Sequence, residues 1–302
     1  MELRSLSPVM LTNAVAKFEN GKVALKNEVF KDLIKNALIY EKLRTNKEVF
    51  DEFYKKLLWW VDFYKEHKEE KQEVKRQLEA ISLWLEKKVL CGGEPEIVDG
   101  EVVNYEEAKN LLNLLNVSNF ELKTGDVVKK KVKLVGKAKR FIGLRKFADR
   151  NSTFEGRLEV NSQKVEEYEK HAQKPELFSI VKENRLVEVI NRFSLKVLET
   201  DKAFFTDRGY SSVVKKLEDI EAESNERLIK LNYKEGILPY GAELFILERI
   251  ETAKGRKEYS HLNGIMKEIT NLGWASEIFN ETREITIDRE PIGWLMFNHQ
   301  SM

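Results

Sequence analysis

One stretch of the sequence concentrates side chains that bind phosphate. Residues 127–150 read VVKKKVKLVGKAKRFIGLRKFADR, with ten cations and one acid, although the whole chain has a formal net charge of only +1. The cations are Lys129, Lys130, Lys131, Lys133, Lys137, Lys139, Arg140, Arg145, Lys146 and Arg150. Clustered lysine and arginine favour nucleic acid, because each phosphate that they neutralise releases condensed counterions. The stretch therefore predicts a phosphate-binding surface.

Two aromatic residues, Phe141 and Phe147, lie among these cations. Aromatic rings stack on unpaired bases, which slightly favours a single-stranded partner and leaves DNA and RNA both open. The chain has no helix-turn-helix or zinc-finger motif, so we expect backbone contacts with little sequence specificity. The alternatives are a plain solvated strand face, or a surface that docks an acidic protein such as the chain's own acidic run at residues 218–226.

A second pattern would support metal-dependent nuclease chemistry. Glu121-Leu122-Lys123 has the Glu-x-Lys form of PD-(D/E)xK-type nucleases, in which a carboxylate holds a divalent metal and the lysine positions or activates water. The upstream acid of such a site would be Asp99. However, a predicted helix at residues 104–116 separates Asp99 from Glu121, where that fold has neighbouring strands. Glu-x-Lys also arises by chance in a Lys- and Glu-rich chain, so the nuclease stays an alternative.

A third pattern would support metal-independent RNA cleavage. Arg256 and His261 have the Arg-x4-His spacing of HEPN-type ribonucleases, in which the two side chains meet across a dimer. Lys257 replaces the polar residue that usually follows the arginine, and the surrounding sequence does not predict the helical bundle of those enzymes. We therefore assign no catalytic residue, and the sequence favours a binding protein over an enzyme.

The remaining chemistry-bearing residues predict neither a metal nor a cofactor. His67, His171, His261 and His299 are widely scattered and lack the spacing of a zinc site, and no glycine-rich phosphate loop occurs. The lone cysteine, Cys91, indicates a reducing, intracellular compartment. The longest apolar runs are too short to cross a bilayer, and the first residues do not resemble a signal peptide. We expect a cytoplasmic protein with no membrane partner.

Alternation of residue types indicates that the basic stretch lies on a strand. Within residues 127–135, Val128, Val132 and Leu134 share one face, while Lys129, Lys131 and Lys133 share the other. Gly136 permits a turn, residues 138–142 would return antiparallel, and residues 154–160 would add a third strand. The pattern predicts a small antiparallel basic sheet within residues 119–160.

Helical periodicity dominates the sequence before this sheet, and we expect a helical bundle domain over residues 1–118. Apolar residues recur at helical spacing in four segments, which begin near residues 29, 49, 74 and 104. The helix at residues 49–64 has the widest apolar stripe, and Thr45 with Glu48 has the form of its capping box. The third helix should end at Gly92-Gly93.

The last segment, residues 161–302, is predicted to be a C-terminal α+β domain. Helices are expected at residues 162–172, 210–231, 243–251 and 259–269, residues 176–200 suit either helix or strand, and residues 284–287 and 294–297 would form a terminal hairpin. The whole chain is thus predicted to be α+β. The favoured function is an intracellular nucleic-acid-binding protein that is one subunit of a larger assembly. A nuclease, or a structural subunit whose basic and acidic patches pair between copies, remains the alternative.

Overall fold

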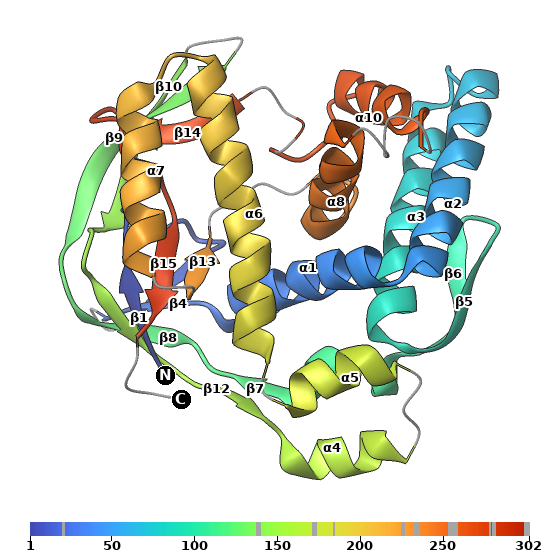
Figure 1. Cartoon of the computed structure of the whole chain (residues 1–302), viewed down its shortest axis with the longest axis horizontal. Coiled ribbons are helices and arrows are strands. Elements are labelled where there is room, and N and C mark those ends of the chain that lie inside the picture. The colour runs from blue at the N-terminus through green and yellow to red at the C-terminus, as the bar shows by residue number, and fades with distance from the viewer. Residues whose placement is uncertain are drawn as a thin grey trace.

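The structure of the chain is a computed structural model, and Figure 1 shows its fold. It describes all residues except 20–21, 137–139, 171–173, 184, 225–226, 232, 234–235, 253–258, 278, 280–281 and 299–302. The fold is α+β, as the sequence predicts: helices pack on one another and against antiparallel sheets.

The largest sheet draws its strands from distant parts of the sequence. In spatial order its seven strands are β13 (Leu228–Lys230), β15 (Trp294–Phe297), β1 (Glu2–Ser5), β11 (Thr153–Glu155), β8 (Phe120–Thr124), β4 (Lys22–Leu25) and β3 (Ala16–Glu19). Neighbouring strands run antiparallel throughout. All three predicted segments contribute to this one sheet, and the division into three domains stays a prediction.

The basic stretch lies in a second, four-stranded sheet. Its strands, in spatial order, are β14 (Thr282–Thr286), β9 (Val127–Gly136), β10 (Arg140–Ala148) and β2 (Val9–Met10). Strand β10 returns antiparallel to β9, as predicted. Two small pairs complete the strands of the described residues: β5 (Gly92–Val98) with β6 (Glu101–Glu106), and β7 (Leu115–Val117) with β12 (Leu158–Val160).

The α-helices surround a core that they share with the larger sheet. They are α1 (Asn27–Thr45), α2 (Lys47–Glu66), α3 (Lys71–Leu90), α4 (Ser162–Glu169), α5 (Pro175–Lys182), α6 (Leu186–Asp207), α7 (Ser211–Ser224), α8 (Tyr240–Glu251) and α10 (Leu262–Asn271). Helices α2 and α3 lie on the opposite side of the view from β9 and β10 (Figure 1). None of the described helices combines the length and the apolar character that a bilayer crossing requires.

Helix α2 shows how the apolar stripe directs packing. Phe50, Phe53, Leu57 and Trp60 recur at helical spacing, and each is at most 1% exposed. They face the core because one side of a 3.6-residue helix collects positions three and four apart. The predicted cap is off by one residue, because the Asn46 side chain accepts the Val49 N–H at 3.0 Å.

The prediction of a fourth helix in the N-terminal segment is wrong. The segment after Asn104 holds the end of β6 and two short 3₁₀ turns, Glu107–Lys109 and Leu111–Leu114, before β7 begins. Pairing of β6 with β5 takes the residues that would start the helix. The Asn110 side chain then accepts the Leu112 N–H at 2.9 Å and holds the chain in a tight turn.

Two strand predictions near the C-terminal side of the basic stretch also need correction. Residues 154–160 form no third strand of the basic sheet, because they divide into β11 and β12, which join two other sheets. The terminal hairpin is wrong as well: β14 pairs with β9, whereas β15 inserts between β13 and β1. The ambiguous segment 176–200 is helical, in α5 and α6.

Candidate nucleic-acid interface

Strands β9 and β10 place lysines and apolar side chains on one face. Their register sets Lys129 opposite Lys146, Lys131 opposite Leu144, and Lys133 opposite Phe141. Directly opposed residues of antiparallel strands project to the same side, with Cβ atoms about 5 Å apart. We call this set of six residues the basic face: Lys129, Lys131, Lys133, Phe141, Leu144 and Lys146.

A β-bulge decides that Phe141 belongs to this face. The register shifts between Phe141 and Gly143, so Ile142 is an extra residue in β10. If residues 141–144 alternated regularly, Phe141 would lie on the side opposite Leu144 and Lys146, because it precedes Leu144 by three positions and side chains alternate with a period of two. Gly143 accommodates the bulge with φ +110°, a conformation that residues with a side chain rarely adopt.

The basic face is open to solvent over most of its area. Lys129, Lys131 and Lys146 are exposed, and none of them makes an ion pair with another described residue. Leu144 is 56% exposed and Phe141 is 72% exposed. Like charges directly opposite each other destabilise a sheet, so the Lys129–Lys146 pair would be relieved by an anion that bridges the two ammonium groups.

Aromatic rings from other elements border the basic face. The Lys146 ammonium lies 4.6 Å from the ring centroid of Phe18 on β3, which is 41% exposed. At the other end, the Lys133 ammonium lies 5.4 Å from the ring centroid of Tyr210. Beyond Lys133 the face closes, because its next neighbour, Val135, is 2% exposed.

Three of the other predicted cations, Lys130, Arg145 and Arg150, do not join this open face. Lys130 contacts Glu290 at 2.9 Å and Asp149 at 3.0 Å, and Arg150 contacts Glu223 at 2.8 Å. Burial alone would lower the pKa of Lys130, but its hydrogen bonds to the two carboxylates outweigh burial and raise it. Arg145 is exposed and opposes Lys130, on the other face of the strand pair. Lys137 and Lys139 lie outside the described residues, as does the side chain of Arg140.

One aromatic residue predicted to bind nucleic acid, Phe147, is buried, and the sequence prediction of the site did not include two exposed apolar residues, Leu144 and Phe18. Phe147 has no exposed surface and packs with Val132 and Ile292 in a small cluster beneath the sheet, so its ring is not available for stacking. Leu144 alternates with Lys146 and could have been identified once the strand was assigned. Phe18 arrives from a distant hairpin, and no local signal in the sequence connects it to the basic stretch.

The PD-(D/E)xK-like residues do not form a metal site. Glu121 and Lys123 lie on β8, where the Lys123 ammonium contacts Glu121 at 3.2 Å and Glu155 at 3.6 Å. Asp99 lies in the turn between β5 and β6, on the other side of the molecule from β8 (Figure 1). Among the described residues, no group of three potential metal-binding side chains comes together.

Only one residue of the Arg-x4-His pattern lies among the described residues. His261 is exposed and precedes α10, while Arg256 lies outside the described residues. His67 is paired with Glu70 at 3.0 Å on the surface of α2, and His171 and His299 lie outside the described residues.

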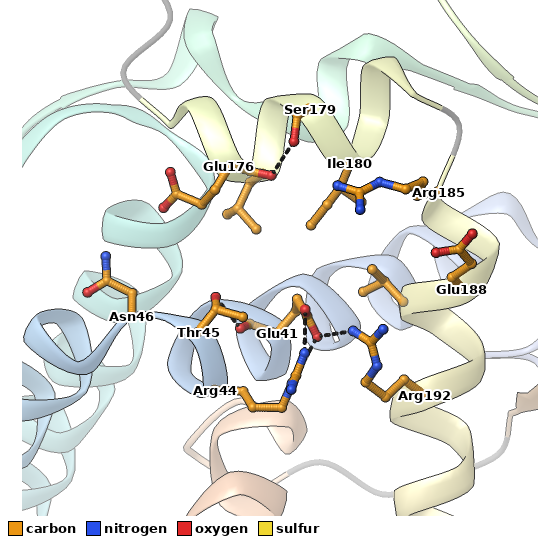
Figure 2. Close-up of a pocket in the computed structure, with 12 residues that line it drawn as sticks. Glu41, Arg44, Thr45, Asn46, Glu176, Ser179, Ile180, Arg185, Glu188 and Arg192 are labelled. Atoms are coloured by element: carbon orange, nitrogen blue, oxygen red, sulfur yellow. Dashed lines mark hydrogen bonds and ion pairs between the residues drawn. The ribbon is translucent and has the colours of Figure 1, made fainter.

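A polar pocket of about 450 Å³ lies between α1, α5 and α6 (Figure 2). Glu41 is buried at its base and accepts hydrogen bonds from Arg44 at 2.8 Å and Arg192 at 2.7 Å. Burial raises the pKa of Glu41, but these two guanidinium groups outweigh burial and lower it. Arg185 in the same pocket pairs with Glu183 at 2.8 Å. Arg44 and Arg192 thus share the single carboxylate of Glu41, and Arg185 pairs with Glu183, so each of these arginines already has a carboxylate partner.

Comparisons with known proteins identify structures of similar fold. No protein-family model matches the chain, and no curated protein matches it significantly. The crystal structure of Csm5 from T. onnurineus matches with a TM-score of 0.58 at 15% identity, covering 92% of this chain and 72% of that one. A chain of the Csm–crRNA–target RNA ternary complex of a type III-A CRISPR-Cas system matches with a TM-score of 0.61 at 15% identity, covering 93% of this chain and 74% of that one. At this identity the likeness establishes a shared fold.

Proposed function

We propose that the chain is an RNA-binding subunit of a multi-protein complex resembling the Csm complexes of type III-A CRISPR-Cas systems. The observation that carries the proposal is the basic face: three exposed lysines without described ion-pair partners, interleaved with exposed Leu144 and Phe141. The fold that presents this face is shared with a chain of a complex that contains crRNA and target RNA. The partners would be RNA and other protein subunits of that complex.

The geometry favours a single strand held by its backbone. Lys129 and Lys131 are two residues apart on one strand, which separates them by about 6–7 Å, close to the spacing of phosphates along an extended single strand. The Phe141 ring supplies a surface on which an unpaired base stacks regardless of its identity. Phosphate contacts position a nucleic acid without reading its sequence, so the binding would be largely independent of sequence.

A salt series with labelled single-stranded RNA tests the proposal. Each single-strand phosphate contact contributes about 0.7 to the slope of log affinity against log salt, so a Lys129→Gln/Lys131→Gln/Lys146→Gln variant should lose up to about 2 from that slope. The matched control is Lys164→Gln/Lys170→Gln/Lys182→Gln, which removes the same charge from exposed positions at α4 and α5. Equal affinities and equal slopes for the two variants would show that the basic face does not hold RNA. Single-stranded DNA of the same sequence, run in parallel, measures the preference for RNA.

A further inference from the structure

Helix α2 carries a ladder of stacked aromatic rings on its outer surface. Trp59, Phe63 and His67 follow one another at intervals of four residues. The Trp59 and Phe63 ring centroids are 5.3 Å apart and the Phe63 and His67 centroids 4.2 Å apart, each pair inclined by 24°. Trp59 is the most exposed large apolar residue of this helix, at 49%. The ladder therefore ends in an accessible indole ring.

A pocket of about 560 Å³ begins where the ladder ends. It lies between α2, α3 and the turn that joins β5 to β6, and its lining includes Lys55, Lys56, Trp59, Ile81, Ile97 and Asp99. Phe63 follows Trp59 by one helical turn and does not line the pocket. Lys55 and Lys56 precede Trp59 by about one turn and do line it, so the pocket extends from Trp59 along α2 away from Phe63.

The wall opposite the helix is held in place by the turn between β5 and β6. Asp99 and Gly100 both have positive φ angles, +50° and +76°, as a tight hairpin turn requires. The Arg76 guanidinium on α3 donates to the Asp99 carbonyl at 3.0 Å. A side chain at position 100 would meet that guanidinium at 2.9 Å, so the turn fits closely against α3. This wall of the pocket is therefore anchored to α3.

The lining matches the parts of a nucleotide. The exposed indole ring and the half-buried side chain of Ile97 offer apolar surface for a planar ring. Lys55 is an exposed residue of the lining, so its ammonium can meet a phosphate that remains hydrated. The Asp99 carboxylate can accept hydrogen bonds from amino groups at a base edge. A volume of this size is typical of sites for small organic ligands.

We propose that this pocket binds one nucleobase of the RNA, stacked on Trp59 as the next ring of the ladder, with its phosphate directed toward Lys55. This inference rests on the proposed function, because it gives the RNA a second contact on the side of the molecule away from the basic face (Figure 1). A base is favoured over a protein segment because the ladder already stacks its rings, with 24° between neighbouring planes. Lys55 and Lys56 in the lining are balanced by Glu52 and Asp99, so the stacked ring rather than net charge carries this preference.

The test compares Trp59→Ala with Trp59→Phe and with Leu83→Ala, which truncates an exposed apolar residue of α3 outside the pocket. The two probes are a labelled single-stranded RNA and the same strand with abasic sugars throughout. Loss of one stacked base should weaken binding of the normal RNA to Trp59→Ala roughly fivefold or more. Trp59→Phe and Leu83→Ala should stay close to the unmodified protein, and the abasic strand should bind Trp59→Ala and the unmodified protein equally.

The outcomes separate this inference from the proposed function. If Trp59→Ala binds RNA normally while the basic-face triple variant is weakened, the base pocket is refuted and RNA binding stands. If the unmodified protein binds no RNA, both proposals fail. If Trp59→Ala binds RNA normally but light scattering shows lost self-association, the surface docks a second copy of the chain, which also overturns the base pocket. Circular dichroism confirms that each variant is folded.

Discussion

Arg283 on β14 donates from Nε to the Asp201 carboxylate on α6 at 2.8 Å, and the two side chains are only 6% and 8% exposed. Strand β14 pairs with β9, so this buried ion pair ties the sheet of the basic face to the longest described helix. The guanidinium also lies 4.7 Å from the ring centroid of Phe204. The position of the basic face therefore depends on charges that solvent hardly reaches.

Removing one member of this pair should be costly. Asp201→Leu would leave the Arg283 guanidinium buried without its carboxylate, and we expect a loss of about 3–5 kcal/mol in the free energy of unfolding. The double variant Asp201→Leu/Arg283→Met should lose less than the sum of the two single variants, because neither member of the pair is then left buried without the other. Urea unfolding measures all three. Strict additivity would contradict a coupled pair, and Asp62→Leu, from an exposed pair with Lys65, gives the surface reference.

The apolar stripe of α2 should contribute strongly to stability. Leu57 has no exposed surface, and truncation of a fully buried leucine leaves a cavity, so Leu57→Ala should cost about 2–5 kcal/mol. Leu83→Ala, at a position that is 40% exposed, should change stability by no more than about 0.5 kcal/mol. Chemical denaturation of both variants checks the difference, and similar values for the two would show that Leu57 does not pack as described.

Phe141 should affect RNA affinity in a different way from the lysines. A stacked base contributes about 1–3 kcal/mol and involves no counterion release, so Phe141→Ser should weaken RNA binding at every salt concentration without changing the salt slope. Val127→Ser, at an exposed apolar position at the start of β9, is the control. A reduced slope for Phe141→Ser would mean that the substitution displaces the lysines rather than removing a stacking surface.

Lys174 should make stability depend on alkaline pH. Lys174 is only 6% exposed, and burial lowers the pKa of its ammonium group from 10.5 to about 8. The charges of Lys42 and Lys88 lower this pKa further, whereas the charge of Glu94 raises it. Between these two pH values the unfolded chain binds the proton that the folded chain has lost, so the contribution of Lys174 to stability rises with pH across this window.

Replacement of Lys174 isolates this effect. Lys174→Met should gain stability relative to the unmodified protein at pH 7, by at most about 3 kcal/mol and by less where solvent screens the amine. The difference should shrink toward pH 10.5. Thermal or urea unfolding at a series of pH values measures it, with Lys164→Met at an exposed position as the reference. A difference that stays constant with pH would show that Lys174 is ordinarily solvated.

Local periodicity predicted much of the fold because it reports directly on which side of an element is buried. The α+β class, the helices α2 and α3, and the antiparallel pair β9 and β10 all follow from spacing in the sequence. Strand pairing that spacing alone does not reveal explains the errors. The segment after Asn104 has helical spacing, but pairing of β6 with β5 takes its first residues. Strand β15 could have turned back on β14, but it pairs with β1 and β13 instead.

The candidate site was predictable to the extent that alternation persists. Lys129, Lys131 and Lys133 follow from a period of two, but the extra residue Ile142 changes the phase of β10 and brings Phe141 to the same face. No local rule separates Lys130 from its neighbours as a paired cation, because its partner Glu290 is distant in sequence. The pocket beside Trp59 joins two helices and a hairpin, and only the assembled fold shows it.

The order of strands in the larger sheet has a consequence for synthesis of the protein. Strand β1 lies between β11 and β15, with Leu3 opposite both Phe154 and Phe297. It is synthesised long before β11 and β15, so both of its edges remain unpaired until these later segments appear. Contacts so distant in sequence slow folding, because the intervening loop must close before they stabilise anything. An unpaired strand edge also invites association between nascent chains. An interior strand of the mature sheet is therefore left with both edges open for much of translation.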